Sequence, residues 1–521
     1  MLSGQPADAS FSDDVLMGTS IDLPSFWKQE RVVAQSSSQT DPITYKEQDS
    51  QTLMQRDEET QTDKATEQGF QLLKSYDYQG LVGFLTRAES LVSAQLLQNI
   101  RSSAFDGYSV EWEERISATS VAHTLTNPRK DPDVVCTELS WNKTGSVVAA
   151  SYGRYDHESW CTHRGSVSAW NIARRELDPS MPNFMADTSS CVICLAFHPT
   201  IPYILAGGTF AGEVIIWHTN NEEDPVFSVS NSDELSHQEP ISKIVWIPTA
   251  KRDHYNLVTI ANDGKILTWD PSNKLQTPLS GSQLLIGNVP AQFRPKASKS
   301  DMGIGGTTIG FPIESRTNYL AGTEGGYIFK CTTTNATQLS IIKRDRAQAP
   351  LSLSNPIQLA YTPHLGPIQA LSCSPFHRNL FLTCGSDSTL RLYNVLESRP
   401  LLTMEPCSSQ LYCVQWSPFR PTVLACTGGD GMLYIYDLMH SKSVPVQSYS
   451  CTSTSAASAS LVTALAFNTK DKQLLATGDS LGAIRVWRLC SSLYTSTISE
   501  EHYIQRLGGL GDGTDGGGMG W

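Results

Sequence analysis

Cysteine and histidine side chains are the residues of this chain best suited to chemistry, because both bind soft metal ions and both act in catalysis. Cys191 and Cys194 form a CxxC pair. They lie in an apolar run that predicts a β-strand, where positions three apart point to opposite faces and cannot share a metal ion. Since no second cysteine pair stands at zinc-binding spacing, we expect both to pack as small apolar side chains.

A second group of reactive side chains lies in residues 152–163, which contain two histidines, one cysteine, two carboxylates and three aromatic rings. Their spacing matches no catalytic triad. A metal or catalytic site is the alternative, but we favour a surface loop that recognises a partner.

Residues 511–516 match the GxGxxG pattern of dinucleotide-binding turns. Such a turn works only between a strand and a helix, and the sequence predicts neither beside these residues. We therefore expect a flexible glycine-rich tail over residues 491–521. Because we find no triad, metal cluster or phosphate loop, the sequence predicts a protein that is not an enzyme and uses no metal or other cofactor.

The scaffold that must position any site is a repeat. Seven times a turn residue is followed, five positions later, by an aromatic residue or its substitute, with mostly strand-forming residues between. The seven pairs are Gly165/Trp170, Gly212/Trp217, Gly264/Trp269, Gly325/Lys330, Ser388/Tyr393, Gly431/Tyr436 and Gly482/Trp487. Their starts are 43 to 63 residues apart, a period typical of rings built from four-stranded sheets. The fourth copy departs most from the pattern, because Lys330 stands where the aromatic residue belongs.

The repeats resemble the WD-repeat family across residues 128–490. An acidic residue precedes the turn in Asp263-Gly264, and Trp269-Asp270 ends on the aromatic-Asp pair of that family. The resemblance implies an all-β fold, a seven-bladed β-propeller. Six aromatic residues then have structural roles in the propeller, namely Trp170, Trp217, Trp269, Tyr393, Tyr436 and Trp487.

The charge balance narrows the classes of partner. The chain has 39 basic and 52 acidic side chains, a net charge of −13. A nucleic-acid backbone calls for a basic face, so we expect no nucleic-acid partner. No apolar run reaches the ~20 residues that span a bilayer, and we find no signal-peptide pattern. The sequence thus predicts a soluble intracellular protein that does not insert into membranes and whose cysteines are free thiols.

Residues 1–69 are acidic, rich in polar side chains and poor in large apolar ones, a composition that predicts a disordered arm. Two related segments stand in this arm, Ser38-Gln39-Thr40 and Thr60-Gln61-Thr62. Short β-prone segments in disordered chain suit recognition by strand addition to the sheet edge of another protein. The second segment resembles the Thr-Gln-Thr anchor read by a dimeric dynein light chain. Chance occurrence in a tract rich in Gln and Thr is the alternative.

Residues 70–103 change to a helical period. One apolar stripe runs along this predicted helix through Leu81, Phe84, Leu85, Ala88, Leu91 and Val92. Residues 104–127 are predicted to be a linker to the propeller. The stripe could fold back onto the ring or pair as a short coiled coil, but we favour a helix that docks a partner.

This order of acidic arm, paired motifs, amphipathic helix and WD-repeat ring resembles the intermediate chains of dynein motors. Residues 102–108, 145–149 with 152–154, and 374–381 resemble the branch that serves cytoplasmic dynein 2. The resemblance implies a non-catalytic subunit that links light chains and heavy chain for retrograde intraflagellar transport and cilium assembly. It also implies that residues 60–62 bind the Thr-Gln-Thr-reading light chain and that the helical stripe binds the roadblock-type light chain.

The resemblance further implies the binding partners and the cellular locations of the protein. The expected partners are the dynein 2 heavy chain, a second and non-identical intermediate chain, and light chains of the Thr-Gln-Thr-reading and roadblock types, with the Tctex type as a further candidate. The expected locations are the cytoplasm, the cytoskeleton, the axoneme and base of the cilium, and the centrosome. The alternative is a WD-repeat scaffold or substrate receptor of a ubiquitin ligase or signalling complex, for which we would expect a basic binding rim on the ring.

Overall fold

The computed structural model describes residues 77–101 and 118–509, the latter with gaps at 127–128, 130–132, 158–160, 162, 222, 295–301, 316, 335–336, 343–350 and 452–459. The chain divides into two units, residues 1–109 and residues 110–521. Each unit is described by itself.

The described part of the first unit is one helix, α1 (Tyr78–Arg101). Its start is capped by Asp77, whose carboxylate accepts a hydrogen bond from the Gly80 N–H at 3.0 Å. Its apolar residues follow the 3.6-residue period, which accounts for the helical conformation. Among the described residues, neither helix is long and apolar enough to cross a membrane.

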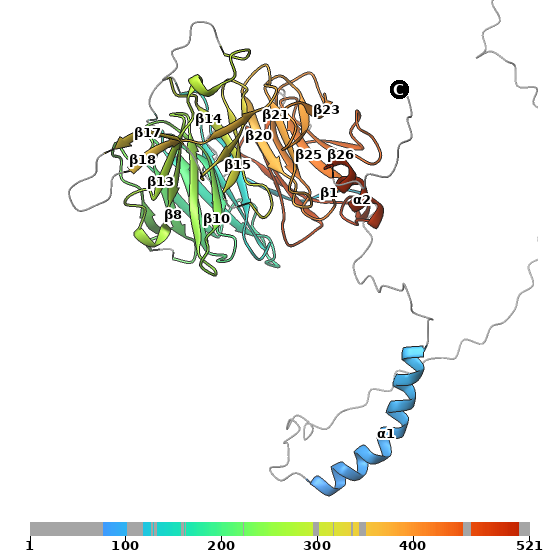
Figure 1. Cartoon of the computed structure of the whole chain (residues 1–521). Coiled ribbons are helices and arrows are strands. Elements are labelled where there is room, and N and C mark those ends of the chain that lie inside the picture. The colour runs from blue at the N-terminus through green and yellow to red at the C-terminus, as the bar shows by residue number, and fades with distance from the viewer. Residues whose placement is uncertain are drawn as a thin grey trace, which may run out of the picture. The chain divides into compact units, whose positions relative to one another are not determined.

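The described part of the second unit is a ring of seven sheets, antiparallel except for the pair β13–β18, shown in Figure 1. The first strands of neighbouring blades contact one another all the way round, including those of the first and last blades. The fold is therefore the seven-bladed β-propeller that the repeats predict. Its strands are rich in β-branched and aromatic residues, which favour extended backbone.

In every blade the first strand lies nearest the centre of the ring. Blade 1 consists of β2 (Val135–Trp141), β3 (Val147–Gly153), β4 (Gly165–Asn171) and β5 (Phe184–Thr188). Blade 2 consists of β6 (Val192–Phe197), β7 (Ile204–Thr209), β8 (Val214–His218) and β9 (Val226–Val229). The core of blade 3 consists of β10 (Ile241–Pro248), β11 (Tyr255–Ala261), β12 (Lys265–Trp269) and β13 (Ser280–Gln283). Blade 4 consists of β14 (Gly306–Gly310), β15 (Asn318–Thr323), β16 (Ile328–Thr332) and β19 (Ile357–Ala360).

The remaining blades follow the same order. Blade 5 consists of β20 (Ile368–Cys373), β21 (Leu380–Gly385), β22 (Leu390–Asn394) and β23 (Pro400–Met404). Blade 6 consists of β24 (Leu411–Trp416), β25 (Val423–Gly428), β26 (Met432–Asp437) and β27 (Gln447–Ser450). Blade 7 consists of β28 (Val462–Phe467), β29 (Leu474–Asp479), β30 (Ile484–Arg488) and β1 (Ser120–Leu125). Short 3-10 turns occur at η4 (Pro271–Asn273), η5 (Ile286–Asn288) and η6 (Ser491–Leu493).

Strand β1 closes the ring. It pairs antiparallel with β30, with Val121 opposite Trp487 and Leu125 opposite Ile484. The prediction of a linker over residues 104–127 is therefore wrong for residues 120–125, which supply the outer strand of blade 7. The pairing joins distant parts of the chain, so the last blade is completed by residues that precede the first blade.

Blade 4 corrects the register of the fourth repeat. The turn residue with positive φ is Gly326, at 78°, rather than Gly325. The position five residues on is Cys331, which is fully buried and pairs with the buried Tyr319 of the neighbouring strand. The Lys330 side chain is thus not the substitute for an aromatic residue, because the repeat was read one position too early.

Blade 3 carries an additional hairpin from the connection inside blade 4. Strands β17 (Thr337–Ile342) and β18 (Leu351–Asn355) pair with each other, and β18 joins β13 in parallel. The hairpin covers the outer edge of blade 3, a position where an unpaired strand would expose its backbone hydrogen-bonding groups.

The segment after blade 7 is folded where a flexible tail was predicted. Helix α2 (Ile498–Leu507) packs Ile504 into the core of blades 5 and 6. The buried Arg420 binds Glu500 of α2 through Nε at 2.9 Å and Asp437 through a terminal nitrogen at 2.7 Å. The prediction for residues 491–521 is therefore wrong for residues 491–508, because these contacts lie outside the repeat pattern. Residues 510–521 lie outside the described residues.

The six aromatic residues of the repeats lie in the third strands of their blades, and each is at most 3% exposed. In blade 3 the Trp269 indole donates to Thr259 Oγ1 at 2.9 Å, and that oxygen lies 2.7 Å from His237 Nε2. The other nitrogen of His237 faces Asp263 at 3.3 Å. This chain of side chains ties the third strand to the second strand and to the loop before the blade.

Candidate functional site

Helix α1 presents an apolar surface. Leu85 is 55% exposed and Leu91 is 71% exposed, whereas Ala88 is half-buried. Together with the exposed Leu81, Phe84 and Val92 they lie three, four or seven positions apart, which places them on one side of the helix. Burying a side chain of this kind stabilises a complex by about 1.5–3 kcal/mol. The stripe therefore has the composition of a protein-docking surface.

Two glycines weaken helix α1 taken alone. Gly80 and Gly83 lie in its first turns, and each glycine costs a helix about 1 kcal/mol relative to alanine. A Cβ on Gly83 would meet nothing within 4 Å, so packing does not require this glycine. A helix with an exposed apolar stripe and two glycines gains stability when a partner covers the stripe.

The predicted light-chain segments at residues 38–40 and 60–62 lie outside the described residues. Their binding to light chains stays a prediction.

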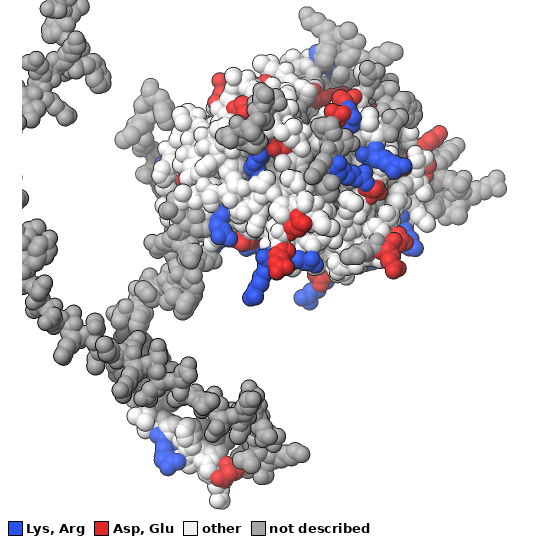
Figure 2. Space-filling view, turned by 180° about the vertical axis from the view of Figure 1, so that it is seen from behind, with Lys and Arg blue, Asp and Glu red and all other residues white. Residues whose placement is uncertain are grey.

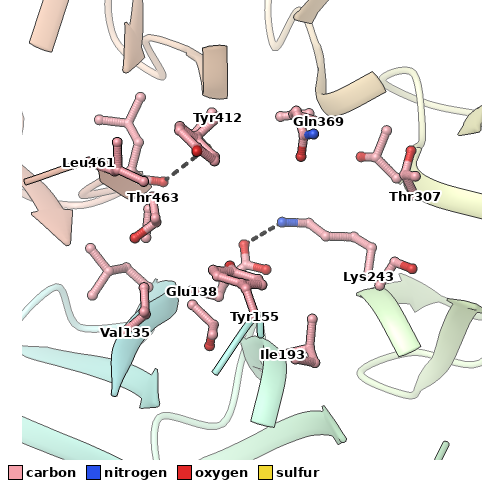
Figure 3. A pocket seen from close by; sticks show the side chains of 18 of the residues that line it. Val135, Glu138, Tyr155, Ile193, Lys243, Thr307, Gln369, Tyr412, Leu461 and Thr463 are labelled. Carbon is pink, nitrogen blue, oxygen red and sulfur yellow. Dashed lines mark hydrogen bonds and ion pairs between the residues drawn. The ribbon is translucent and has the colours of Figure 1, made fainter. Parts of the chain in front are cut away.

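The centre of the ring is a channel of ≈ 890 Å³. Residues from the first strands of all seven blades line it, including Thr137 of β2, Thr308 of β14 and Thr463 of β28. Figure 3 shows an ion pair between Glu138 of β2 and Lys243 of β10 in this channel. The sequence analysis did not single these residues out, although polar side chains at alternate positions of each first strand could have indicated a polar channel.

The surroundings in the channel favour the charged form of Lys243 and the neutral form of the Cys413 thiol. Burial disfavours the charge on Lys243, but the Glu138 carboxylate more than offsets this effect, so the pKa of the lysine lies above its usual value. Burial raises the pKa of Cys413, the thiol of the described lining, to about 11. That thiol stays protonated at neutral pH and is a poor nucleophile.

The predicted recognition loop reaches the mouth of the channel. Arg154, Tyr155 and Asp156 line the channel wall. Arg154 binds Asp156 at 2.7 Å, and the hydrogen bond from this arginine lowers the pKa of the Asp156 carboxyl to about 2. Tyr155 is 56% exposed, so its ring is accessible to a partner.

The two cysteines of the CxxC pair point apart. The Cys194 thiol donates to the Ile241 carbonyl at 3.4 Å inside the core between blades 2 and 3. The Cys191 thiol instead faces the recognition loop, where it lies 4.0 Å from the His163 carbonyl oxygen. Cys191 precedes β6, and the strand register shifts between Val192 and Cys194, so the two thiols meet different neighbours.

Lysine and arginine do not form a basic rim on the face of the ring that Figure 2 shows. Basic and acidic side chains are interspersed there, with broad uncharged areas between them. On this face, the charge pattern lacks the feature that we expected of a WD-repeat substrate receptor.

Comparisons with known proteins agree with the architecture. The family model described as "Dynein axonemal intermediate chain 3 WD40 domain" matches residues 312–489. "Cytoplasmic dynein 2 intermediate chain 2" of Mus musculus is 35% identical over 97% of this chain and 93% of its own length. The protein of the same name from Homo sapiens is 36% identical over 80% of this chain and 76% of its own length. "Dynein intermediate chain 3, ciliary" of Heliocidaris crassispina is 26% identical over 60% of this chain and 48% of its own length. The chain therefore belongs to the family of dynein intermediate chains.

Proposed function

We propose that this chain is a non-catalytic intermediate chain of cytoplasmic dynein 2 that links light chains to the heavy chain in retrograde intraflagellar transport and cilium assembly. The similarity to cytoplasmic dynein 2 intermediate chains over nearly the whole chain supports this assignment. The structural observation that carries it is the exposed apolar stripe of α1, which follows the Thr60-Gln61-Thr62 segment in the chain.

The proposed division of labour has three parts. Residues 60–62, and residues 38–40 as a second segment, bind the Thr-Gln-Thr-reading light chain, and a Tctex-type light chain is a further candidate for the arm. The stripe of α1 binds the roadblock-type light chain. A dimeric light chain holds this arm beside that of a second, non-identical intermediate chain, so each later light chain binds at high local concentration.

The propeller binds the heavy chain in this proposal. Its channel carries a compensated ion pair and a protonated thiol, which support a role in binding rather than in catalysis. The proposed places of action are the cytoplasm, the cytoskeleton, the axoneme and base of the cilium, and the centrosome.

The assignment is tested by purifying the tagged chain from ciliated cells and identifying its stoichiometric companions by mass spectrometry. We expect a dynein heavy chain, light chains and a second intermediate chain. Recovery of a ubiquitin-ligase scaffold without dynein subunits would refute the proposal.

The role of α1 is tested by Leu85→Asp. The change removes about 1.5–3 kcal/mol of apolar burial and adds the cost of a charge at the interface, so we expect affinity for the roadblock-type light chain to fall at least roughly 100-fold. Ser90→Asp places the same charge on the opposite side of the helix and should leave binding unchanged. Isothermal titration calorimetry measures both. Equal binding by the two variants would show that this stripe is not the docking surface.

A further inference from the structure

Three potential metal ligands meet where blades 1 and 2 adjoin. His157 and Cys161 belong to the loop between β3 and β4, and Cys191 immediately precedes β6. The ligand atoms of these three residues all lie within 4.8 Å of one another. His157 Nε2 lies 3.0 Å from Cys161 Sγ. The cluster joins residues 30 positions apart in the chain (191 − 161), so no local sequence motif marks it.

A fourth ligand stands beside these three. The His163 ring is 5.3 Å from the His157 ring, centre to centre, and His163 Nδ1 is buried without a hydrogen-bond partner among the described residues. An unsatisfied buried polar atom of this kind is energetically unfavourable. Coordination of a cation would remove that cost. Phe210 of blade 2 stacks on His157 at 4.2 Å and holds its ring in place.

A backbone amide faces the sulfur of Cys161. The N–H of Cys191 donates to Cys161 Sγ at 3.3 Å. Hydrogen bonds from backbone amides to a ligating sulfur are typical of the outer shell of metal sites.

We propose that Cys161 Sγ, Cys191 Sγ and His157 Nε2 bind one soft divalent cation of the Zn²⁺ class, with the His163 imidazole in the fourth position. Two thiolates and two imidazoles form a donor set typical of structural zinc. Tetrahedral coordination with Zn–S near 2.3 Å and Zn–N near 2.0 Å places neighbouring ligand atoms about 3.3–3.8 Å apart. The ligand atoms of His157, Cys161 and Cys191 lie within 4.8 Å of one another, so small side-chain rotations bring these three to that spacing. Rotation of the neighbouring His163 ring supplies the fourth ligand.

The bound ion fixes the position of the recognition loop. It ties His157 and Cys161 to Cys191 at the start of blade 2, and Arg154 and Tyr155 precede this anchor at the channel mouth. The sequence prediction of no metal considered Cys191 only with Cys194. The structure brings Cys191 to Cys161 instead, because the loop folds across the boundary between blades.

The test measures metal bound to the purified full-length chain by inductively coupled plasma mass spectrometry. We expect about one zinc per chain in the wild type and in Cys407→Ser, a matched change of another half-buried cysteine. Cys161→Ser and Cys191→Ser should each lower the zinc content to background, and His163→Asn should weaken binding in a chelator titration. Circular dichroism checks that every variant keeps its strands.

A second measurement does not depend on the folding of any variant. The wild-type chain is stripped with a chelator and reloaded with Co²⁺, and we expect a thiolate-to-cobalt charge-transfer band. Absence of that band overturns the proposal. Equal zinc in wild type and in the Cys161→Ser/Cys191→Ser double variant overturns it as an adventitious ion only. A wild-type mass lower by two hydrogens and restored by reductant overturns it in favour of a disulfide between these cysteines.

Discussion

Replacing Glu500 with alanine should release helix α2 from the propeller while the ring stays folded. The Glu500 carboxylate accepts two hydrogen bonds from Arg420, at 2.9 and 3.0 Å, and one from Thr422 at 3.3 Å. Hydrogen bonds that involve a charged group contribute about 1.5–3 kcal/mol each. Breaking a buried ion pair costs about 3–5 kcal/mol when the remaining charge has no partner. Arg420 keeps Asp437 at 2.7 Å, so we expect the lower end, about 3 kcal/mol.

Besides this ion pair, α2 packs Ile504, Tyr503 and Leu507 against the core of blades 5 and 6, so we expect local release of the helix rather than unfolding of the ring. Ile504 is the buried apolar side chain of the helix, and the Tyr503 hydroxyl donates to the Leu438 carbonyl at 3.2 Å. A loss of about 3 kcal/mol corresponds to roughly 100-fold faster amide hydrogen exchange if exchange reports opening of the helix. Mass spectrometry of exchange in residues 498–507 measures this, and strands of blades 1 to 4 serve as the internal reference.

Glu501→Ala is the matched control. Glu501 is exposed and lies in the same first turn of α2, so its loss changes the interaction with the helix dipole to a similar degree but leaves Arg420 paired. Equal acceleration in the two variants would show that the helix dipole, rather than the buried ion pair, holds α2. Unchanged exchange in Glu500→Ala would refute the role of Arg420 as its anchor.

Three further predictions concern the arm, helix α1 and the pH dependence of folding. Changing residues 60–62 together to alanine should abolish binding of the Thr-Gln-Thr-reading light chain in titration calorimetry and leave the melting temperature of the ring unchanged. Gly83→Ala should slow amide exchange in α1 about fivefold, since it contributes about 1 kcal/mol to the helix and its Cβ meets nothing. Gly80→Ala should not do so, because its Cβ would lie 2.4 Å from the capping carboxylate of Asp77. Burial lowers the pKa of His198 from 6.5 to about 4. Between these pH values the His198 side chain is therefore protonated in the unfolded chain but neutral in the folded chain. Stability should therefore fall below pH 6.5, by about 2 kcal/mol at pH 5 from this residue, and His198→Asn should flatten thermal unfolding profiles measured between these values.

Each of these predictions can fail in a distinct way. Retained light-chain binding by the variant of residues 60–62 would place the anchor elsewhere in the arm. Equal exchange in the wild type and in Gly83→Ala would mean that α1 is already held by other contacts. An unchanged acid slope in His198→Asn would show that other buried histidines, such as His364, whose pKa burial also lowers, dominate the loss of stability.

The repeat pattern was sufficient to predict the propeller, because each blade contains the whole pattern within a short stretch of sequence. A turn residue, a short β-prone run and a large buried residue recur within one blade, and seven such units bury their faces only by closing a ring. The apolar stripe of α1 could also be predicted from the sequence, since the helical period is a local property. Burial of Trp170, Trp217 and Trp269 follows from their places on third strands between neighbouring blades.

Other features arise only when distant residues meet. Pairing of β1 with β30 joins residues more than 350 positions apart, and an isolated edge strand has no periodic signal strong enough to assign its partner. Docking of α2 depends on Arg420, a charged residue whose burial is stabilised by the carboxylates of Asp437 and Glu500 and by the Ser492 carbonyl oxygen. The one-residue error in blade 4 has the same origin, because adjacent glycines leave the turn position to be decided by backbone geometry.

The candidate metal site shows most clearly which features the sequence determined and which the tertiary structure decided. The rule of strand alternation predicted that Cys191 and Cys194 face apart, and their contacts differ, although Cys191 precedes β6 and the register shifts between Val192 and Cys194. Which residues each thiol then meets was decided by the packing of blade 1 against blade 2, which brings the loop carrying His157 and Cys161 to Cys191. Local periodicity specifies strands and faces, whereas contacts across blades depend on ring closure and on the path of the loops between strands.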